Sequence, residues 1–109
     1  MPFREEKLKV LFMKLAAGFL KITGDTSSLV TVTDASISKD LENATFFVTV
    51  FPDKEEARTL AELQKKRNDA RVFFMQHTKM KSVPHVTFAI DKGEKARQRI
   101  EELLNEEKG

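Results

Sequence analysis

The chain is predicted to fold as an α+β domain with the element order helix, strand, strand, helix, helix, strand, followed by one more helix. Three observations predict this order. Apolar residues recur at three- and four-residue steps in residues 4–22, as expected of a helix that packs one face on a core. Two runs of β-branched and aromatic residues, 29–37 and 44–51, flank a polar turn, as in an antiparallel hairpin. Apolar and polar residues alternate in 85–90, as in a half-buried strand.

Length and composition point to a single soluble domain over residues 1–109. A globule of 109 residues buries roughly 65% of its unfolded surface, which is enough for a core without a metal or a disulfide. Nine phenylalanines argue against disorder, and the absence of a long uncharged apolar run argues against a membrane span. The chain has no cysteine, which fits the cytoplasm and excludes a thiolate metal site. We expect a monomer that makes no membrane contact.

The first helix should span Arg4 to Ile22 and face the core with one apolar stripe. Gly18 lowers the helix propensity and could allow close crossing over another element. Residues 24–28 contain the glycine and the polar residues of a helix stop followed by a loop. The apolar stripe consists of Leu8, Leu11, Phe12, Leu15, Phe19 and Ile22.

The hairpin carries two further features. The apolar phase changes within its first strand, which predicts a bulge near Thr33 and Asp34. In the second strand, every other residue from 44 to 50 belongs to an apolar face, while Phe47 and Phe51 lie on the opposite face. These two rings could stack on bases or fill a partner's pocket. The more common arrangement, which we expect, is that the C-terminal helix or a loop covers them.

The segment after the hairpin should form two helices. Asp53 is expected to be the N-cap of the first, and Glu56, three residues later, would complete a capping box. The helical pattern continues toward Thr78, but its apolar phase shifts at 66–69. Two helices that meet at Asn68 explain this shift best.

The last part of the chain should form a strand and a helix. Pro84 ends the preceding element, and after the strand Asp91 and Glu94 repeat the capping pattern. Residues 105–109 should fray. The last helix has a narrow apolar stripe, formed by Ala96, Ile100, Leu103 and Leu104.

Positive charge is concentrated in one part of the chain, although the net charge is only +2. Between Glu62 and Lys81, six lysines and arginines stand against two acidic residues. A charge run of this kind is most often a solvated helix face. It is also what a phosphate-binding surface requires.

Four motifs carry a family resemblance: Val-Thr-Val-Thr-Asp at 30–34, Ser-Lys-Asp-Leu at 38–41, Ala-Thr-Phe-Phe-Val-Thr-Val-Phe at 44–51 and Lys-Met-Lys-Ser-Val-Pro-His-Val-Thr-Phe at 79–88. They resemble the ribosome-binding factor A family of bacterial assembly factors. The resemblance implies a KH-like fold of the second topological type with a three-stranded sheet, in which a kinked helix pair with an Ala-x-Gly pattern replaces the Gly-x-x-Gly loop. Lys66-Arg67-Asn68 stands at this kink, and Asn68 can adopt the left-handed conformation that glycine would.

The resemblance also implies a function. It predicts a protein that is not an enzyme, binds rRNA on the immature small ribosomal subunit and assists its late maturation, including 16S rRNA processing. The expected partners are small-subunit rRNA and, beside it, ribosomal proteins, and no cofactor or metal is expected. Basic side chains at the kink and in two turns would then meet phosphates. The predicted RNA-binding residues are Lys65, Lys66, Arg67, Asn68, Arg71, Lys79, Lys81 and Lys39.

Two other classes of function compete with this one. An enzyme finds little support, because His77 and His85 are the only histidines and neither has a partner at a metal-binding spacing. Asp34 and Asp40 are better explained by bulge and turn chemistry than as a catalytic pair. The remaining alternative is a protein-interaction module that uses the Phe47 face of the sheet or the C-terminal helix and makes no direct RNA contact.

Overall fold

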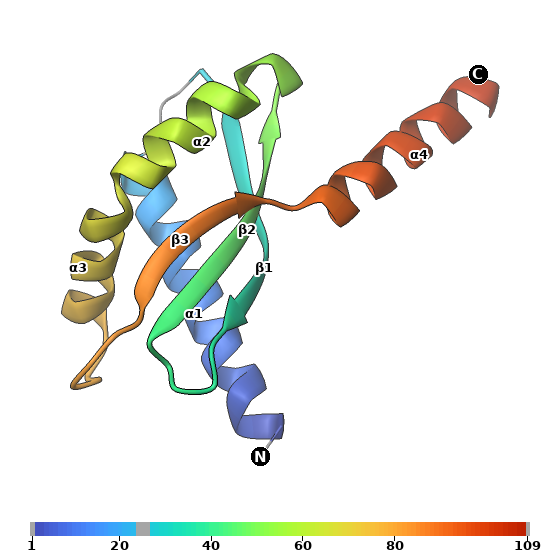
Figure 1. The fold of residues 1–109 in the computed structure, drawn as a ribbon. Coiled ribbons are helices and arrows are strands. Elements are labelled where there is room, and N and C mark those ends of the chain that lie inside the picture. The colour runs from blue at the N-terminus through green and yellow to red at the C-terminus, as the bar shows by residue number, and fades with distance from the viewer. Residues whose placement is uncertain (1, 24–26, 109) are drawn as a thin grey trace.

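The computed structural model describes residues 2–23 and 27–108 and has the predicted order of elements (Figure 1). The predicted loop at 24–28 lies partly outside the described residues. The elements are α1 (Pro2–Thr23), β1 (Leu29–Ile37), β2 (Asn43–Phe51), the short 3-10 helix η1 (Asp53–Glu55), α2 (Glu56–Lys65), α3 (Arg67–His77), β3 (His85–Ile90) and α4 (Lys92–Lys108).

The three strands form one mixed sheet in the order β1-β2-β3. β1 and β2 are antiparallel, whereas β3 runs parallel to β2 and is connected to it through α2 and α3. The predicted bulge is confirmed, because the register of β1 shifts between Val32 and Asp34. Helices α1, α2 and α3 cover one face of the sheet, and α4 leaves the fold from the end of β3 (Figure 1).

The core lies between the covered face of the sheet and these three helices. The ring of Phe12 stacks on that of Phe74 with the centroids 5.5 Å apart, and Phe46 meets Phe74 edge-on at 5.6 Å. The predicted inner face of β2 is confirmed, since its four apolar residues at 44, 46, 48 and 50 are all buried. Aromatic pairs of this geometry stabilise a core beyond the area that they bury.

The predicted apolar stripe of α1 is correct in the middle of the helix and wrong at two positions. Phe19 is buried, but Leu11 is exposed and Ile22 is 73% exposed. Ala16 and Leu20 are buried in their place. The reason is that a helix turns about 100° per residue, so a core that reaches Ala16 and Leu20 leaves Leu11 and Ile22 at its solvent-facing margins.

One of the two predicted helix caps is confirmed. The Glu94 backbone N–H donates to the Asp91 carboxylate over 2.9 Å at the start of α4. The capping box of Asp53 and Glu56 is wrong, because Asp53 belongs to η1 and neither η1 nor α2 has a side-chain cap. The turn is closed by the backbone instead, since the Glu55 N–H donates to the Pro52 carbonyl over 3.0 Å.

The sheet face away from the helices is open at one end. Phe51 is 69% exposed and pairs across the hairpin with Leu29, which is 66% exposed. Phe47 is half-buried. The expected cover by the C-terminal helix is wrong for Phe51, because α4 runs away from the sheet (Figure 1). α4 also stays helical to Lys108, so the fraying expected from residue 105 is not seen in 105–108.

Candidate nucleic-acid interface

The bend between α2 and α3 lies at Lys66. This residue has φ −94° and ψ 10°, a conformation open to ordinary residues, and its N–H donates to carbonyls of the last turn of α2. Asn68 lies inside α3, and Leu41 is the only non-glycine residue with a positive φ in the described part of the chain. The kinked helix pair is therefore present. The prediction of a left-handed Asn68 is wrong, because the chain bends two residues earlier without one.

Two of the predicted RNA-binding side chains are used within the fold. The Lys66 ammonium donates to the Thr23 carbonyl over 3.0 Å, at the C-terminus of α1, where the helix dipole favours a cation. The Arg71 guanidinium donates to the Val83 carbonyl over 3.3 and 3.2 Å. Both side chains are half-buried. They tie α2 and α3 to α1 and to the start of β3.

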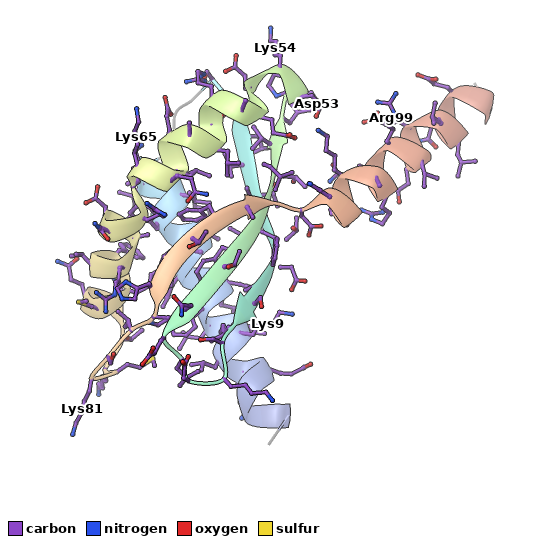
Figure 2. The ribbon with its side chains drawn as sticks, viewed as in Figure 1. Lys9, Asp53, Lys54, Lys65, Lys81 and Arg99 are labelled. Atoms are coloured by element: carbon purple, nitrogen blue, oxygen red, sulfur yellow. The ribbon has the colours of Figure 1, made fainter. Side chains whose placement is uncertain are left out.

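The other predicted residues at the bend face solvent. Lys65, Arg67 and Asn68 are exposed, and Figure 2 shows Lys65 pointing away from the fold. The Arg67 Nε donates to the Gln64 carbonyl over 2.8 Å, which leaves the guanidinium nitrogens at its tip facing outward. Lys65 and Arg67 are thus the two cations of this bend that a phosphate can reach directly. We call them the junction pair.

The remaining three cations lie at one end of the molecule. Lys39 belongs to the β1–β2 loop, and Lys79 and Lys81 belong to the α3–β3 loop; all three are exposed. The two loops are neighbours, because the His85 N–H donates to the Glu42 carbonyl over 2.8 Å. Figure 2 shows Lys81 pointing away from the tip of its loop. We call these three residues the loop group. Helix α3, with 11 residues, separates them from the junction pair by about 16 Å.

The β1–β2 loop is held by its own side chains. The Ser38 hydroxyl donates to the Asp40 carboxylate over 2.6 Å, and the Glu42 N–H donates to the same carboxylate over 3.0 Å. These two hydrogen bonds hold the pKa of Asp40 below its ordinary value. Asp34 accepts hydrogen bonds from Lys9 at 2.6 Å and from the Ala35 N–H at the bulge, which lowers its pKa as well. Turn and bulge chemistry therefore accounts for both aspartates, as the sequence predicted.

The described residues offer no arrangement for metal or histidine chemistry. They contain no group of three or more His, Asp or Glu side chains that could hold a metal ion. His77 stacks on Phe73 at 4.0 Å and hydrogen-bonds through Nδ1 to the Phe73 carbonyl, while His85 is exposed at the start of β3. No helix among residues 2–23 and 27–108 is long and apolar enough to cross a membrane.

The arrangement of cations around a kinked helix pair and two loops can be compared with known proteins. A profile of the family described as ribosome-binding factor A matches residues 4–104. This chain belongs to that family. Relatives named ribosome-binding factor A include one from Thermobifida fusca, 36% identical over 104 residues, which cover 93% of this chain and 69% of the relative.

Two further relatives with the same name agree with this assignment. The one from Kineococcus radiotolerans is 30% identical over 108 residues, covering 96% of this chain and 63% of the relative. The one from Brevibacillus brevis is 35% identical over 78 residues, covering 71% of this chain and 64% of the relative. The chain therefore spans about two thirds of the length of the relatives that it matches.

Solved structures of the family share the fold. The crystal structure of ribosome-binding factor A from Thermus thermophilus has a TM-score of 0.69 at 20% identity, covering 78% of this chain and 93% of that one. A solution structure from Thermotoga maritima, of a putative ribosome binding factor A, has a TM-score of 0.70 at 24% identity, with 81% and 87% covered. The predicted KH-like α+β fold is thereby confirmed. A homology model of the Thermus thermophilus ribosome binding factor A, fitted into a cryo-EM map of a 30S–RbfA complex, has a TM-score of 0.67 at 21% identity, with 76% and 90% covered.

The sequence did not single out Leu41, which closes the β1–β2 loop with φ 61°. A signal was available, because the Ser-x-Asp pattern at Ser38 and Asp40 favours a tight turn bonded to its own side chains. Such a turn requires an unusual backbone conformation close by, and here the leucine carries it.

Proposed function

We propose that this chain is a non-enzymatic ribosome assembly factor that binds rRNA on the immature small subunit and assists its late maturation, including 16S rRNA processing. Membership of the ribosome-binding factor A family supports this, and so does the related protein fitted into a map of a 30S complex. We further propose that the chain acts as a cytoplasmic monomer without a cofactor, and that ribosomal proteins add contacts on the same particle.

One observation carries the assignment of the surface. The five exposed cations form no ion pair with any carboxylate in the described part of the chain. A surface cation that forms no ion pair can neutralise a phosphate, which releases the counterions condensed on the nucleic acid, without first giving up a carboxylate partner. Phosphate contacts of this kind set the position of a protein on a nucleic acid. The five are Lys39, Lys65, Arg67, Lys79 and Lys81.

In this proposal the residues that the sequence grouped together have two roles. Lys66 and Arg71 hold the helices in place through backbone carbonyls, so they position the surface. The junction pair and the loop group contact phosphates, and Asn68 lies beside the junction pair as an exposed hydrogen-bonding group.

A protein-interaction module is the second candidate, and the open sheet face favours it. Phe51 and Leu29 lie side by side across the hairpin and are each about two thirds exposed. The stripe on α4 is also uncovered, with Ile100, Leu103 and Leu104 each more than half exposed. Exposed apolar groups that cluster are typical of contact surfaces.

Co-sedimentation with immature small subunits tests the proposal. The variant Lys65→Glu with Arg67→Glu should lose most of its binding, since both charges reverse where phosphates would lie. The matched control is Lys54→Glu with Arg99→Glu, which reverses two exposed cations on other elements and should bind as the unchanged protein does (Figure 2). Equal binding by both double variants would reject the junction pair. Capture of subunit proteins that survives nuclease treatment would favour the interaction module.

A further inference from the structure

The first half of α1 and the β1–β2 loop line a cavity of about 430 Å³ that is open to solvent. This volume lies within the range of about 300–1,000 Å³ that is typical of small-ligand sites. The described residues that line it include the aliphatic side chains of Leu8, Ile37 and Leu41. The polar and charged residues of this lining, which we call the rim, are Glu6, Lys9, Ser38 and Lys39.

Leu41 holds the wall of the cavity at a cost in backbone strain. Its φ of 61° is left-handed, which costs a side chain with a Cβ about 1–2 kcal/mol and which glycine adopts freely. The strain does not serve the core, because the Leu41 side chain is 41% exposed. The loop keeps the conformation through backbone bonds, since the Leu41 N–H donates to the Ser38 carbonyl and the Ser38 N–H to the Asn43 carbonyl, each over 2.9 Å. Strain that persists at a surface loop is typical of sites of contact.

The rim indicates what the cavity would hold. The Lys9 ammonium forms an ion pair with the Asp34 carboxylate at 2.6 Å, whereas Lys39 forms no ion pair with a described residue. A ligand that matches these lining residues has an apolar body with hydrogen-bonding edges and an anionic group beside it. A nucleotide has this chemistry, with Glu6 available as an acceptor for amino groups of the base. An aliphatic side chain of a protein would fill the walls and leave the Lys39 charge unused.

The position of the cavity favours a nucleotide within a strand over a free one. The β1–β2 loop lies beside the α3–β3 loop, because His85 donates to the Glu42 carbonyl and pairs with Asn43. Phosphates that pass Lys79 and Lys81 can thus continue to Lys39, which lines the cavity. Figure 2 shows Lys9 and Lys81 in the half of the molecule away from Lys54. Recognition of RNA usually targets bases that have left the stack.

We propose that this cavity takes one unstacked base of a single-stranded rRNA segment, with an adjoining phosphate on Lys39. The proposal rests on the proposed function and refines it, since it separates a base-binding subsite from the phosphate contacts of the junction pair. Leu41 supplies one wall, and the backbone hydrogen bonds of the loop hold that wall in place against the strain before the base arrives.

The test uses fluorescence anisotropy to measure the affinity of the protein for a short single-stranded RNA and for an abasic strand of equal length. The change Leu41→Gly removes the wall and also relieves the strain, so the variant should fold at least as well. Its affinity for the RNA should fall about fivefold to tenfold, as expected for the loss of one base contact, while its affinity for the abasic strand should not change. Lys39→Ala should weaken binding to both strands. Leu103→Ala, which shortens an exposed leucine of α4, is the matched control and should bind as the unchanged protein does.

Methyl NMR gives a second readout at the cavity itself. The methyl signals of Leu8, Ile37 and Leu41 should shift with the RNA, because a base ring lies against them, and should stay in place with the abasic strand. If they stay in place with both while Lys65→Glu with Arg67→Glu still abolishes binding, the base subsite is overturned and the proposed function stands. If the unchanged protein binds neither strand and no small subunit, both are overturned. Shifts produced by a ribosomal protein in place of RNA would also overturn the subsite, in favour of a protein contact.

Discussion

The α2–α3 bend and the β1–β2 loop are both sharp turns with exposed cations, yet they are built in opposite ways. The bend uses an ordinary backbone conformation at Lys66 and fixes it with a long-range side-chain bond to Thr23. The loop is fixed by short-range bonds around Asp40 and stores its strain in the backbone of Leu41. An asparagine, which tolerates the left-handed conformation almost as glycine does, therefore need not be the residue that adopts it. Here Asn68 is unstrained and Leu41 is strained.

The largest effect should appear in the salt dependence of RNA binding. This measurement tests whether the two regions contact the same RNA molecule. With five contacting cations, log affinity for single-stranded RNA should fall with log salt at a slope of about −3.5. Lys65→Ala with Arg67→Ala, at the bend, should reduce the slope by about 1.4. Lys79→Ala with Lys81→Ala, in the α3–β3 loop that lies beside the β1–β2 loop, should reduce it by the same amount. Anisotropy titrations over a range of salt measure both. A slope that only one of the pairs changes would show that the other region lies off the RNA.

The next effect concerns how the bend is anchored. Lys66→Glu removes the hydrogen bond to the Thr23 carbonyl and places a negative charge at the C-terminus of α1, so it should lower the free energy of unfolding by about 2 kcal/mol. Lys65→Glu, next to it and exposed, should change stability by about 0.5 kcal/mol or less. Urea melts of the two variants provide the comparison. Similar unfolding midpoints for the two variants would mean that the hydrogen bond of Lys66 does not stabilise the fold.

Glycine substitutions should have opposite signs in the two regions. Leu41→Gly should leave stability unchanged or raise it by about 1 kcal/mol, because relief of the left-handed strain exceeds the entropy that glycine adds to the unfolded chain. Asn68→Gly should be destabilising by about 0.3 kcal/mol and less stable than Asn68→Val, because Asn68 lies within α3. Denaturant melts of the three variants decide the order. If Asn68→Gly proves stabilising, the result would support a left-handed conformation at Asn68.

The smallest effect should be the pH dependence that Asp40 contributes in the β1–β2 loop, which has no counterpart at the bend. Hydrogen bonds from Ser38 and from the Glu42 N–H hold the pKa of Asp40 below its usual value of 3.8, so ionised Asp40 stabilises the folded state. This contribution is complete above the ordinary aspartate pKa and is lost as the pH falls through the lowered one. Between about pH 5 and about pH 3, Asp40→Asn should therefore lose less stability than the unchanged protein. Ser38→Ala, which removes the principal donor, should flatten the profile in the same direction.

Local patterns in the sequence were enough to predict the elements and one face of the sheet. The order of helices and strands, the bulge between Val32 and Asp34 and the Asp91 cap all depend on residues that are close in the chain. Two local predictions were wrong, the capping box of Asp53 and Glu56 and the left-handed Asn68, and a further prediction was wrong because distant segments decide it. Phe51 was expected to be covered, but no periodicity indicates where α4 points once it leaves the sheet.

The candidate site shows the same division. The sequence could identify a run of cations between Glu62 and Lys81, and in the structure Lys65, Arg67, Lys79, Lys81 and Lys39 are exposed. The sequence could not show that Lys66 differs from these exposed cations. Its ammonium binds the carbonyl of Thr23 in the first helix, and this contact depends on how α1 crosses the bend. Charge alone does not reveal whether a lysine faces outward or binds a carbonyl of its own fold.

The parallel pairing of β2 and β3 has a consequence for the order in which the chain folds. β1 and β2 are joined by a short loop, whereas β3 reaches β2 only after both α2 and α3 have been placed, so its partners Asn43 and His85 are remote in the chain. Closing a long connection costs entropy before any strand contact repays it. We expect the β1–β2 hairpin to form early and the docking of β3 to limit the rate, with the two loops that bear Lys39 and Lys81 meeting only in that last step.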